Sequence, residues 1–435
     1  MKVLLASIPA TGHFNPLLVV ANILKKAGHE TAFYTSTMFR DKVEAAGSRF
    51  FPMPHEADQG VQDTIAGFLK RNIYAPGLEE QSNGFRGGFV DPMLAQFRGL
   101  QELLQEFPAD LIVHETCFTG VFPFLLGPRS ARPVIAFLGV LPLPLNRADG
   151  APWGPGLIPT NDPEKLKEYA EIAREFREKK DLPLKEAADR LLAELGLPAL
   201  PGRIFESAAL LSDIVLQPCV PSFEFPLREP AKKVHYIGAL LPQGAGDVPS
   251  GLKDARKAGK KIVLVSQGTV ANNDLGKLLA PAIRGLGDRE DFLVLATTGG
   301  KPIESIPCTL TPNTVASQYL NFGQILPDVD VLVAFGSYGT VTQALSLGVP
   351  MVVVGRGEDK PEVGARVTTT GCGIYLATDT PSSEQVREAV DQILTKPEYR
   401  VNADKLRREL AAHNPEKELA TLLEVLVDDQ QVLVG

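Results

Sequence analysis

The sequence predicts an α/β protein of two domains, each a parallel sheet covered by helices, that face one another across a cleft. The chain has 435 residues, and a domain size of roughly 100–200 residues favours two domains. In both halves, short apolar segments typical of buried parallel strands alternate with helical segments. Turns that contain Pro, Gly and Ser interrupt this alternation around residues 218–259. We therefore expect two Rossmann-like domains joined by that segment.

The first strand and the first helix have clear sequence signals. Lys2–Ile8 is a short apolar run that fits a buried strand. A helix is expected at Leu17–Ala27, because Asn15 is a good N-cap residue and Pro16 fits the first helical position. Gly28 suits the end of that helix. The residues just before Asn15 should then form the turn between strand and helix.

The rest of the first half continues the alternation. Strands are predicted at Glu30–Thr35, Arg49–Pro52, Asp110–His114 and Pro133–Leu138, and helical segments at Arg40–Ala46 and Pro163–Leu195. Two long irregular stretches, Ala57–Pro92 and Gly139–Pro159, lie between these elements. Loops of this length in an α/β domain are usually functional, so we expect both to shape a pocket above the strand ends.

The second half repeats the pattern. Strands are predicted at Lys261–Ser266, Phe292–Thr297, Thr314–Leu320, Val329–Phe335 and Pro350–Gly355, and helices at Asp274–Leu286 and Thr340–Leu347. Two last helices are split at Asn414-Pro415, and the second has the leucine spacing of one buried face. The predicted organisation is a first domain at 1–217, a connection at 218–259, a second domain at 260–400, and C-terminal helices at 401–435 that return to the first domain.

Composition excludes several functional classes. The net charge is −8, so a nucleic-acid binder with a basic face is not expected. No run of about 18 apolar residues is present, which argues against a membrane span. The short apolar start leads straight into a helix start and does not resemble a signal peptide. The four cysteines are far apart and predict neither a zinc site nor disulfides, so we expect a cytoplasmic protein with reduced thiols.

His13 is the first candidate for chemistry. It lies between the first strand and the first helix, and ligands of an open parallel sheet bind outside the carboxyl ends of its strands. A histidine there can take a proton from an attacking hydroxyl. The alternative is a histidine that only caps or packs in the turn.

Glu115 is the expected partner of His13. It follows the strand Asp110–His114, which should end at the same edge of the sheet. A carboxylate bonded to the imidazole would fix its tautomer and stabilise the imidazolium. The neighbouring His114 should point to the opposite face. Glu115 could also be an ordinary carboxylate at a strand end.

Polar turns in the second half suit an anionic ligand. Phe335–Val341 is a glycine-containing turn between a strand and a helix, where N–H groups and the helix dipole favour a diphosphate. Ser266–Thr269 offers a similar strand end in the same domain. Charged residues at Glu358–Glu362 could bond sugar hydroxyls. Each signal also fits a plain structural turn or a solvated loop.

Together these residues resemble the family-1 glycosyltransferases, which include UDP-glycosyltransferases and macrolide glycosyltransferases. The resemblance covers nearly the whole chain and is most specific at Gly12-His13-Phe14-Asn15-Pro16, Gly336–Val341, Ala344–Val354 and Asp359. It implies a GT-B fold, with an acceptor pocket in the first domain and a nucleotide-sugar site in the second. It also implies that His13 deprotonates the acceptor and that the sugar carbon is inverted without a metal ion.

The resemblance also implies particular binding residues. In the donor site Tyr319 would stack on the nucleotide base, Gln343 would contact the ribose, and Asp359 with Lys360 would contact sugar hydroxyls. The complete donor set is Gly12, Gly268, Thr269, Tyr319, Phe322, Phe335, Gly336, Ser337, Tyr338, Gly339, Thr340, Gln343, Asp359 and Lys360. The apolar composition of the long loops gives Phe68, Tyr74, Phe85, Phe89, Leu141 and Trp153 as acceptor residues, and Phe14, next to His13, completes the predicted acceptor set.

Several positions depart from the family pattern. Phe335 stands where the family has a histidine that contacts the diphosphate, and Glu115 stands where it has an aspartate. Further departures are Ser337 for Gly, Gln343 for Glu, Asn321-Phe322 for Pro-Gln and Lys360 for Gln. These changes should leave the fold intact and affect donor binding, so the loss of the imidazole at Phe335 should weaken affinity for the donor.

The sequence thus predicts an inverting transferase that moves a hexose, most simply glucose from UDP-glucose, to a hydroxyl of a small apolar natural product or xenobiotic. A TDP-sugar is the other donor considered. No bound cofactor or metal is expected, and the enzyme should be a monomer or a homodimer. Two alternatives remain open: a non-catalytic nucleotide-sugar-binding protein of the same fold, and a GT-B nucleotide-sugar epimerase, which would need catalytic carboxylates in place of His13.

Overall fold

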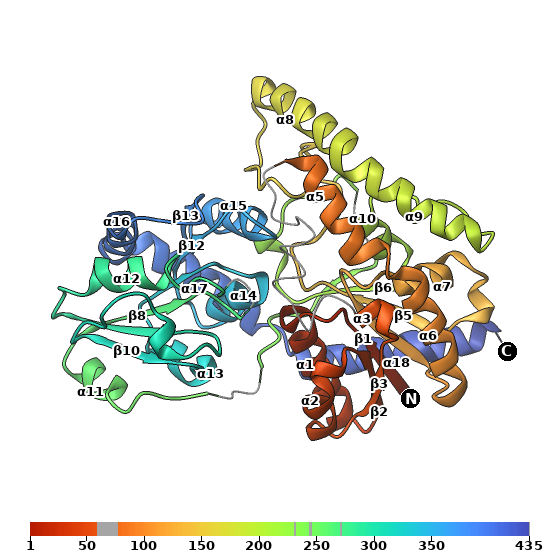
Figure 1. Ribbon diagram of the computed structural model, residues 1–435, viewed down its shortest axis with the longest axis horizontal. Coiled ribbons are helices and arrows are strands. Elements are labelled where there is room, and N and C mark those ends of the chain that lie inside the picture. Colours follow the sequence, from red (N-terminus) through yellow and green to blue (C-terminus); the bar gives the residue numbers. More distant parts are fainter. Residues whose placement is uncertain (59–76, 230–231, 243–245, 270–271, 435) are drawn as a thin grey trace.

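The computed structural model describes residues 1–58, 77–229, 232–242, 246–269 and 272–434, which form two domains side by side (Figure 1). Each domain has one sheet, and every strand pair in both sheets is parallel. Strand order is β3-β2-β1-β4-β5-β6-β7 in the first sheet and β10-β9-β8-β11-β12-β13 in the second. The prediction of two Rossmann-like α/β domains is confirmed.

The first sheet is built from strands whose two faces are both covered. Its strands are β1 (Lys2–Ala6), β2 (Glu30–Thr35), β3 (Arg49–Pro52), β4 (Leu111–Glu115), β5 (Val134–Leu138), β6 (Ile214–Gln217) and β7 (Val234–Tyr236). In β1, Leu4 and Ala6 pack into one hydrophobic cluster and Val3 and Leu5 into another. This continuous burial is why the strands read as apolar runs without alternation.

The helices of the first domain are α1 (Thr11–Lys26), α2 (Arg40–Ala45), α3 (His55–Asp58), α5 (Leu78–Phe85), α6 (Met93–Glu106), α7 (Phe122–Leu126), α8 (Pro163–Phe176), α9 (Leu182–Glu194) and α10 (Ile204–Leu211). The stretch Gly139–Pro159 has no helix or strand, as its sequence predicts. In the stretch Ala57–Pro92, residues 59–76 lie outside the described part of the chain, and residues 78–90 are helical, so the prediction of an irregular loop is wrong there. Two glutamates in the first turn of α5 favour that helix.

Helix α1 begins at Thr11, five residues before Pro16, which the start signals indicate as its first residue. Its N-cap residue is Ala10, and the N–H groups of His13 and Phe14 both donate to the carbonyl of Ala10 at 2.9 Å. Asn15 is therefore not the N-cap residue, and Pro16 lies inside the helix. His13 consequently sits in the first turn of α1, where the helix fixes its backbone.

The second domain has strands β8 (Lys261–Ser266), β9 (Phe292–Thr297), β10 (Thr314–Ser317), β11 (Val331–Ala334), β12 (Met351–Val354) and β13 (Gly373–Leu376). Its helices are α11 (Leu252–Lys257), α12 (Leu279–Leu286), α13 (Phe322–Ile325), α14 (Tyr338–Ser346), α15 (Lys360–Thr370), α16 (Ser383–Thr395) and α17 (Pro397–Ala411). Helix α14 begins at Tyr338, two residues before its expected start, so Ser337 is its N-cap residue.

The chain passes between the domains at two places that touch. Strand β7 still pairs with β6 of the first sheet, although it lies in the segment expected to be the connection. The chain enters the second domain at Gly238, and it leaves near His413, after which α18 (Pro415–Val434) packs against α1 (Figure 1). A Cβ on Gly238 would lie 2.7 Å from the Cβ of His413. Two separate stretches of chain are thus in contact where the domains join.

Among the described residues, no helix is both long enough and apolar enough to cross a membrane.

Candidate active site

His13 and Glu115 meet at the carboxyl edge of the first sheet. Strands β1 and β4 are parallel neighbours with Ala6 opposite His114, so the first turn of α1 lies beside the end of β4. The Nδ1 atom of His13 is 2.5 Å from Oε2 of Glu115. The Glu115 side chain is fully buried, whereas that of His13 is 17% exposed. The sequence-predicted pair is therefore in direct contact, with the imidazole on the solvent side.

Backbone groups hold the Glu115 carboxylate in place. The N–H of Ile8 donates to Oε1 at 3.1 Å, and the N–H of Cys117 donates to Oε2 at 2.8 Å. Burial raises the pKa of Glu115, but the charge of His13 and the hydrogen bonds from His13, Cys117 and Ile8 outweigh burial and lower it overall. The carboxylate is thus ionised at neutral pH.

The same contact tunes His13. Burial lowers the pKa of His13, but the charge and hydrogen bond of Glu115 outweigh this effect and raise the pKa above its ordinary value. Because Nδ1 faces the carboxylate, a neutral His13 carries its hydrogen on Nδ1 and keeps Nε2 as the proton acceptor. The arrangement can therefore accept a proton at Nε2 and stabilise the imidazolium that results.

His114 has a structural role on the opposite face of β4. Its Nε2 lies 3.0 Å from the hydroxyl oxygen of Ser212, and burial lowers its pKa to about 4. The prediction that His114 points away from Glu115 agrees with these contacts.

Cys117 is close to the same pair. Potential ligand atoms of His13, Glu115 and Cys117 lie within 4.8 Å of one another. Burial, followed by the charges of Glu115 and Asp359, raises the pKa of the Cys117 thiol well above its usual range. His13 Nδ1 and Glu115 Oε2 already bond each other, so a metal ion held by these three side chains would have to displace that contact. These three side chains therefore fit a hydrogen-bonded dyad better than a metal centre.

The second domain brings acidic groups toward His13. After Glu115, the negative charges of Asp359 and Glu358 are the next causes that raise the pKa of His13. Both residues come directly before α15. The dyad of one domain and the charged segment of the other thus face each other, which is the arrangement that a cleft between the two sheets requires.

The turn before α14 is shaped for close approach. Gly336 has a φ of 62°, and a Cβ there would lie 2.6 Å from the side chain of Val353. The hydroxyl oxygens of Ser337 and Thr340 are 3.0 Å apart at the surface. Gly339 is exposed, and a Cβ on it would have no neighbour within 4 Å. The first turn of α14 therefore presents hydroxyl and backbone groups to an approaching ligand.

Tyr338 differs from its neighbours in this turn. Its N–H donates to Oδ2 of Asp359 at 3.1 Å. Its buried hydroxyl donates to Oε1 of Glu224 at 2.7 Å and accepts from Nε2 of Gln217 at 2.8 Å. The side chain thus packs in the domain interface, and the predicted phosphate contact by Tyr338 has no support from its side chain.

Lys360 lies beside the phenylalanine that replaces the family's histidine. Its ammonium bonds the carboxylate of Glu358 and lies 5.9 Å from the centre of the Phe335 ring. Burial lowers the pKa of Lys360, but the charges of Glu358 and Asp359 outweigh burial and raise it. A positive charge is therefore retained next to Phe335, although the side chain at position 335 is apolar and buried.

The other predicted donor residues have varied exposure. Gly268 and Thr269 are exposed just after β8, and Gly12 is exposed in the first turn of α1. Tyr319 is 53% exposed, as a platform for a flat ring would be, and Phe322 begins α13 half-buried. Gln343 is buried on α14, one turn beyond Gly339.

The structure does not confirm the predicted acceptor set as a whole, and it does not confirm that the set lies beside His13. The prediction that Phe14 contacts the acceptor is wrong, because Phe14 is fully buried and its ring stacks on that of Phe39 at a centroid distance of 4.1 Å. Phe68 and Tyr74 lie outside the described residues. The carbonyl of Leu141 accepts from Nε2 of Gln217 at the domain interface.

Phe85, Phe89 and Trp153 come together around one apolar cavity. They line it together with Phe205, Lys180 and Arg203, and ring centroids of Phe89 and Phe205 are 5.7 Å apart. The cavity has a volume of about 30 Å³, well below the roughly 300–1,000 Å³ of a typical ligand pocket. His13 does not line it, so the predicted link between these rings and the base is not seen among the described residues.

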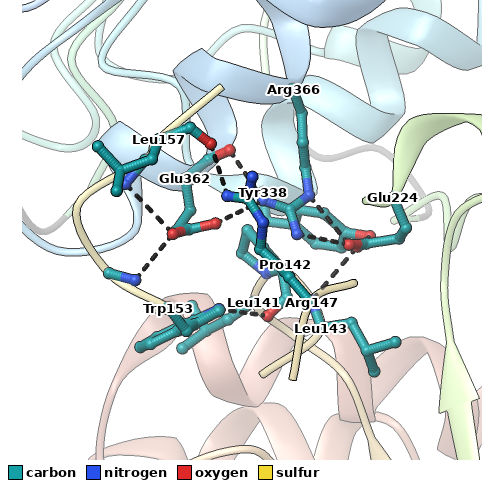
Figure 2. A network of polar contacts seen from close by, with 12 residues as sticks. Leu141, Pro142, Leu143, Arg147, Trp153, Leu157, Glu224, Tyr338, Glu362 and Arg366 are labelled. Carbon is teal, nitrogen blue, oxygen red and sulfur yellow. Dashed lines mark hydrogen bonds and ion pairs between the residues drawn. The ribbon is translucent and has the colours of Figure 1, made fainter. Parts of the chain in front are cut away.

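A buried charge network at the domain interface escaped the sequence analysis. It joins Glu224, Glu362 and Arg366 to Tyr338 and to the loop after β5 (Figure 2). The spacing of Glu362 and Arg366, four residues apart on α15, was an available signal for one of its ion pairs.

Known sequences share this chain's length and pattern. Residues 290–426 match the family described as "Erythromycin biosynthesis protein CIII-like, C-terminal domain". The chain is 34% identical over 429 residues to 4'-demethylrebeccamycin synthase of Lentzea aerocolonigenes, covering 98% of this chain and 99% of that protein. It is 31% identical to UDP-glucosyltransferase 1 of Beauveria bassiana, covering 94% of this chain and 92% of that protein.

Solved structures agree on the fold. The calicheamicin glycosyltransferase CalG4 superposes with a TM-score of 0.71 at 19% identity, covering 98% of each chain. This likeness confirms the GT-B arrangement of two Rossmann-like domains. The sequence relatives support a sugar-transferring enzyme of the natural-product type that uses a nucleotide-sugar donor. The chain belongs to the family-1, macrolide-type glycosyltransferases.

Proposed function

We propose that this enzyme transfers a hexose, most simply glucose from UDP-glucose, to a hydroxyl of a small apolar acceptor, with His13 as the general base. The observation that carries the proposal is the 2.5 Å contact between His13 and the buried Glu115. A protein that only binds nucleotide sugars has no need of a partly exposed imidazole backed by an ionised carboxylate. The activity named in a 31% identical relative, UDP-glucosyltransferase 1, supports glucose and uridine as first choices.

The chemistry follows from the position of the free ring nitrogen. Nε2 of His13 takes the proton of the acceptor hydroxyl while the oxygen attacks the anomeric carbon of the donor. The new carbon–oxygen bond forms on one face as the bond to the diphosphate breaks on the other, so the configuration inverts. The diphosphate leaves with the bonding electron pair. The proton stays on His13, where the negative charge of Glu115 stabilises the imidazolium.

The donor half of the proposal uses the turn before α14. The diphosphate would lie over Gly336–Thr340, where the hydroxyls of Ser337 and Thr340 and the backbone at Gly339 are accessible. Lys360 would supply a positive charge near the departing phosphate, since its ammonium lies over the Phe335 ring. Asp359, which bonds the N–H of Tyr338, would face the sugar. Tyr319 would stack on the base.

A donor screen tests this proposal. The protein is mixed with UDP- and TDP-sugars and its melting temperature is recorded, because a ligand that binds the folded state raises it. UDP-glucose is expected to give the largest increase, and mass spectrometry with apolar phenols or alcohols should then detect a glucosylated product. If another nucleotide sugar gives the larger increase and the product, the choice of donor is wrong. If donors bind but no acceptor is modified, the transferase assignment fails and the binding-protein alternative gains.

A further inference from the structure

The Glu362 carboxylate connects the two domains by bonding backbone groups of the opposite one (Figure 2). Its Oε1 accepts from the N–H of Gly154 at 2.8 Å and from the N–H of Gly156 at 3.2 Å. Its Oε2 accepts from Nη1 of Arg366 at 2.7 Å within α15. The side chains of Glu362 and Arg366 are 1% and 2% exposed. One buried carboxylate therefore divides its two oxygens between the second domain and a loop of the first.

Arg366 is held from its other side by the segment after β6. Its Nε and Nη2 donate to Oε2 of Glu224 at 2.9 and 2.7 Å. The other oxygen of Glu224 accepts from the hydroxyl of Tyr338 at 2.7 Å and from the N–H of Leu143 at 3.3 Å. The guanidinium is thus fixed by two carboxylates, and Glu362 cannot turn away without leaving polar groups unpaired in the interior.

The loop itself is anchored to the same cluster. We use the name cleft loop for residues 139–159, which contain Leu141 and Trp153. Nη1 of Arg147 donates to the carbonyl of Leu157 at 2.5 Å. The guanidinium groups of Arg147 and Arg366 lie 4.3 and 4.2 Å from the centre of the Phe225 ring. A loop without helix or strand thereby gains a defined position against the second domain.

The fit at Gly156 leaves no space for a side chain. Gly156 has a φ of 67°, and a Cβ there would overlap the carbonyl of Pro361 in the first turn of α15. That helix begins directly after Asp359, with Lys360 as its first residue. The cleft loop therefore lies against the same helix end that carries the proposed sugar-binding residues.

We propose that Glu362 is a positioning residue that couples the two halves of the site: by holding Gly154 and Gly156 against α15, it sets the place of the acceptor-side cleft loop. The inference rests on the proposed assignment of donor and acceptor sides. Its consequence is that removing the Glu362 charge should impair acceptor use more than donor binding. Trp153, the single tryptophan of the chain, lies next to Gly154 and reports the position of the loop.

The test compares Glu362→Gln with Glu388→Gln, a control that removes the same charge at an exposed position of α16. Iodide quenching of Trp153 fluorescence and hydrogen–deuterium exchange of peptides covering residues 150–158 report the loop without any turnover. Both are expected to increase in Glu362→Gln, with amide exchange about tenfold faster, since a charged hydrogen bond is lost. Acceptor KM should rise about tenfold while donor Kd, measured by calorimetry, stays within about twofold.

Gly156→Ala provides a second route to the same result. It separates the loop from Pro361 without altering charge, and it should raise quenching and acceptor KM in the same direction. Unchanged quenching and exchange in Glu362→Gln would overturn the inference. So would a freer loop with unchanged acceptor KM, or an equal loss of donor and acceptor affinity accompanied by a lower melting temperature. If the wild-type protein transfers no sugar, the proposed function fails instead, and the fluorescence and exchange results still decide whether Glu362 holds the loop.

Discussion

The two halves of the active site are organised differently. The proposed base of the first domain, His13, is positioned by contacts within that domain: Glu115 is fully buried and bonded by His13, Ile8 and Cys117. The turn of the second domain that we propose for donor binding keeps Ser337 and Gly339 at the surface. Proton transfer needs a side chain of fixed geometry and tuned pKa, whereas a diphosphate needs donors that stay accessible. The contrast separates changes that should lower turnover from changes that should lower donor affinity.

The largest expected effect is on the base. His13→Ala should lower turnover by roughly 10²–10⁴, the usual range for a general base, and leave donor Kd nearly unchanged. Steady-state kinetics with an alcohol acceptor and calorimetry with the donor check both parts. A strongly acidic acceptor should be less affected, because it loses its proton with little help. Turnover within a few-fold of the wild type on an alcohol acceptor would remove His13 from the mechanism.

Glu115→Gln should have the next largest effect. The imidazolium loses the full negative charge that stabilises it, so turnover should fall about ten- to a hundred-fold, the equivalent of a charged hydrogen bond. Circular dichroism should show an intact fold, and donor Kd should not move. A fall in donor affinity of the same size would mean that the two halves are not separable in this way.

Lys360→Met tests the donor half. The substitution keeps an apolar stem over Phe335 but removes the ammonium, so donor Kd should weaken about tenfold. Lys277→Met, at an exposed position of the second domain, is the matched control. His13 is unchanged in this variant, so the fall of kcat/KM at acid pH should keep its shape. Unchanged donor affinity would show that Lys360 does not compensate for the missing histidine in binding the diphosphate.

The smallest effect is a shift on the pH axis. His13 acts as a base only when neutral, so kcat/KM should fall as pH drops through its pKa. Since that pKa is raised above the ordinary value of about 6.5, the acid limb should lie above pH 6.5 in the wild type. In Glu115→Gln the principal cause that raises the pKa is gone, and the limb should move to lower pH. A limb that stays in place would show that Glu115 does not set the pKa of His13.

The fold could be predicted because its signals are local. Runs such as Lys2–Ile8 are apolar on both faces, and the helices between them have regular spacing. The dyad could be predicted because parallel strands end at one edge, which brings Glu115 to the first turn of α1. The sequence was less informative about the direction in which each side chain points. Neighbouring residues of a helix point about 100° apart, so His13 faces the cleft and Phe14 faces the core.

The interface network could not be predicted in the same way. Glu224 and Arg366 are 142 residues apart in sequence and belong to different segments of the fold. No periodicity connects two such positions, because only the packing of one domain against the other brings them together. The same applies to Lys360, whose ammonium meets the Phe335 ring through the path of the chain between β12 and α15.

The contact between Gly238 and His413 has a mechanical consequence. It lies where the chain enters the second domain and where it leaves, so two covalent connections run through one place. A rotation of one domain about this contact would leave both tethers in place, whereas a sliding motion there would stretch them. The pivot of such a rotation lies at this contact, and displacement grows with distance from it. A rotation about Gly238 would therefore alter the separation between His13 and Asp359, which belong to different domains.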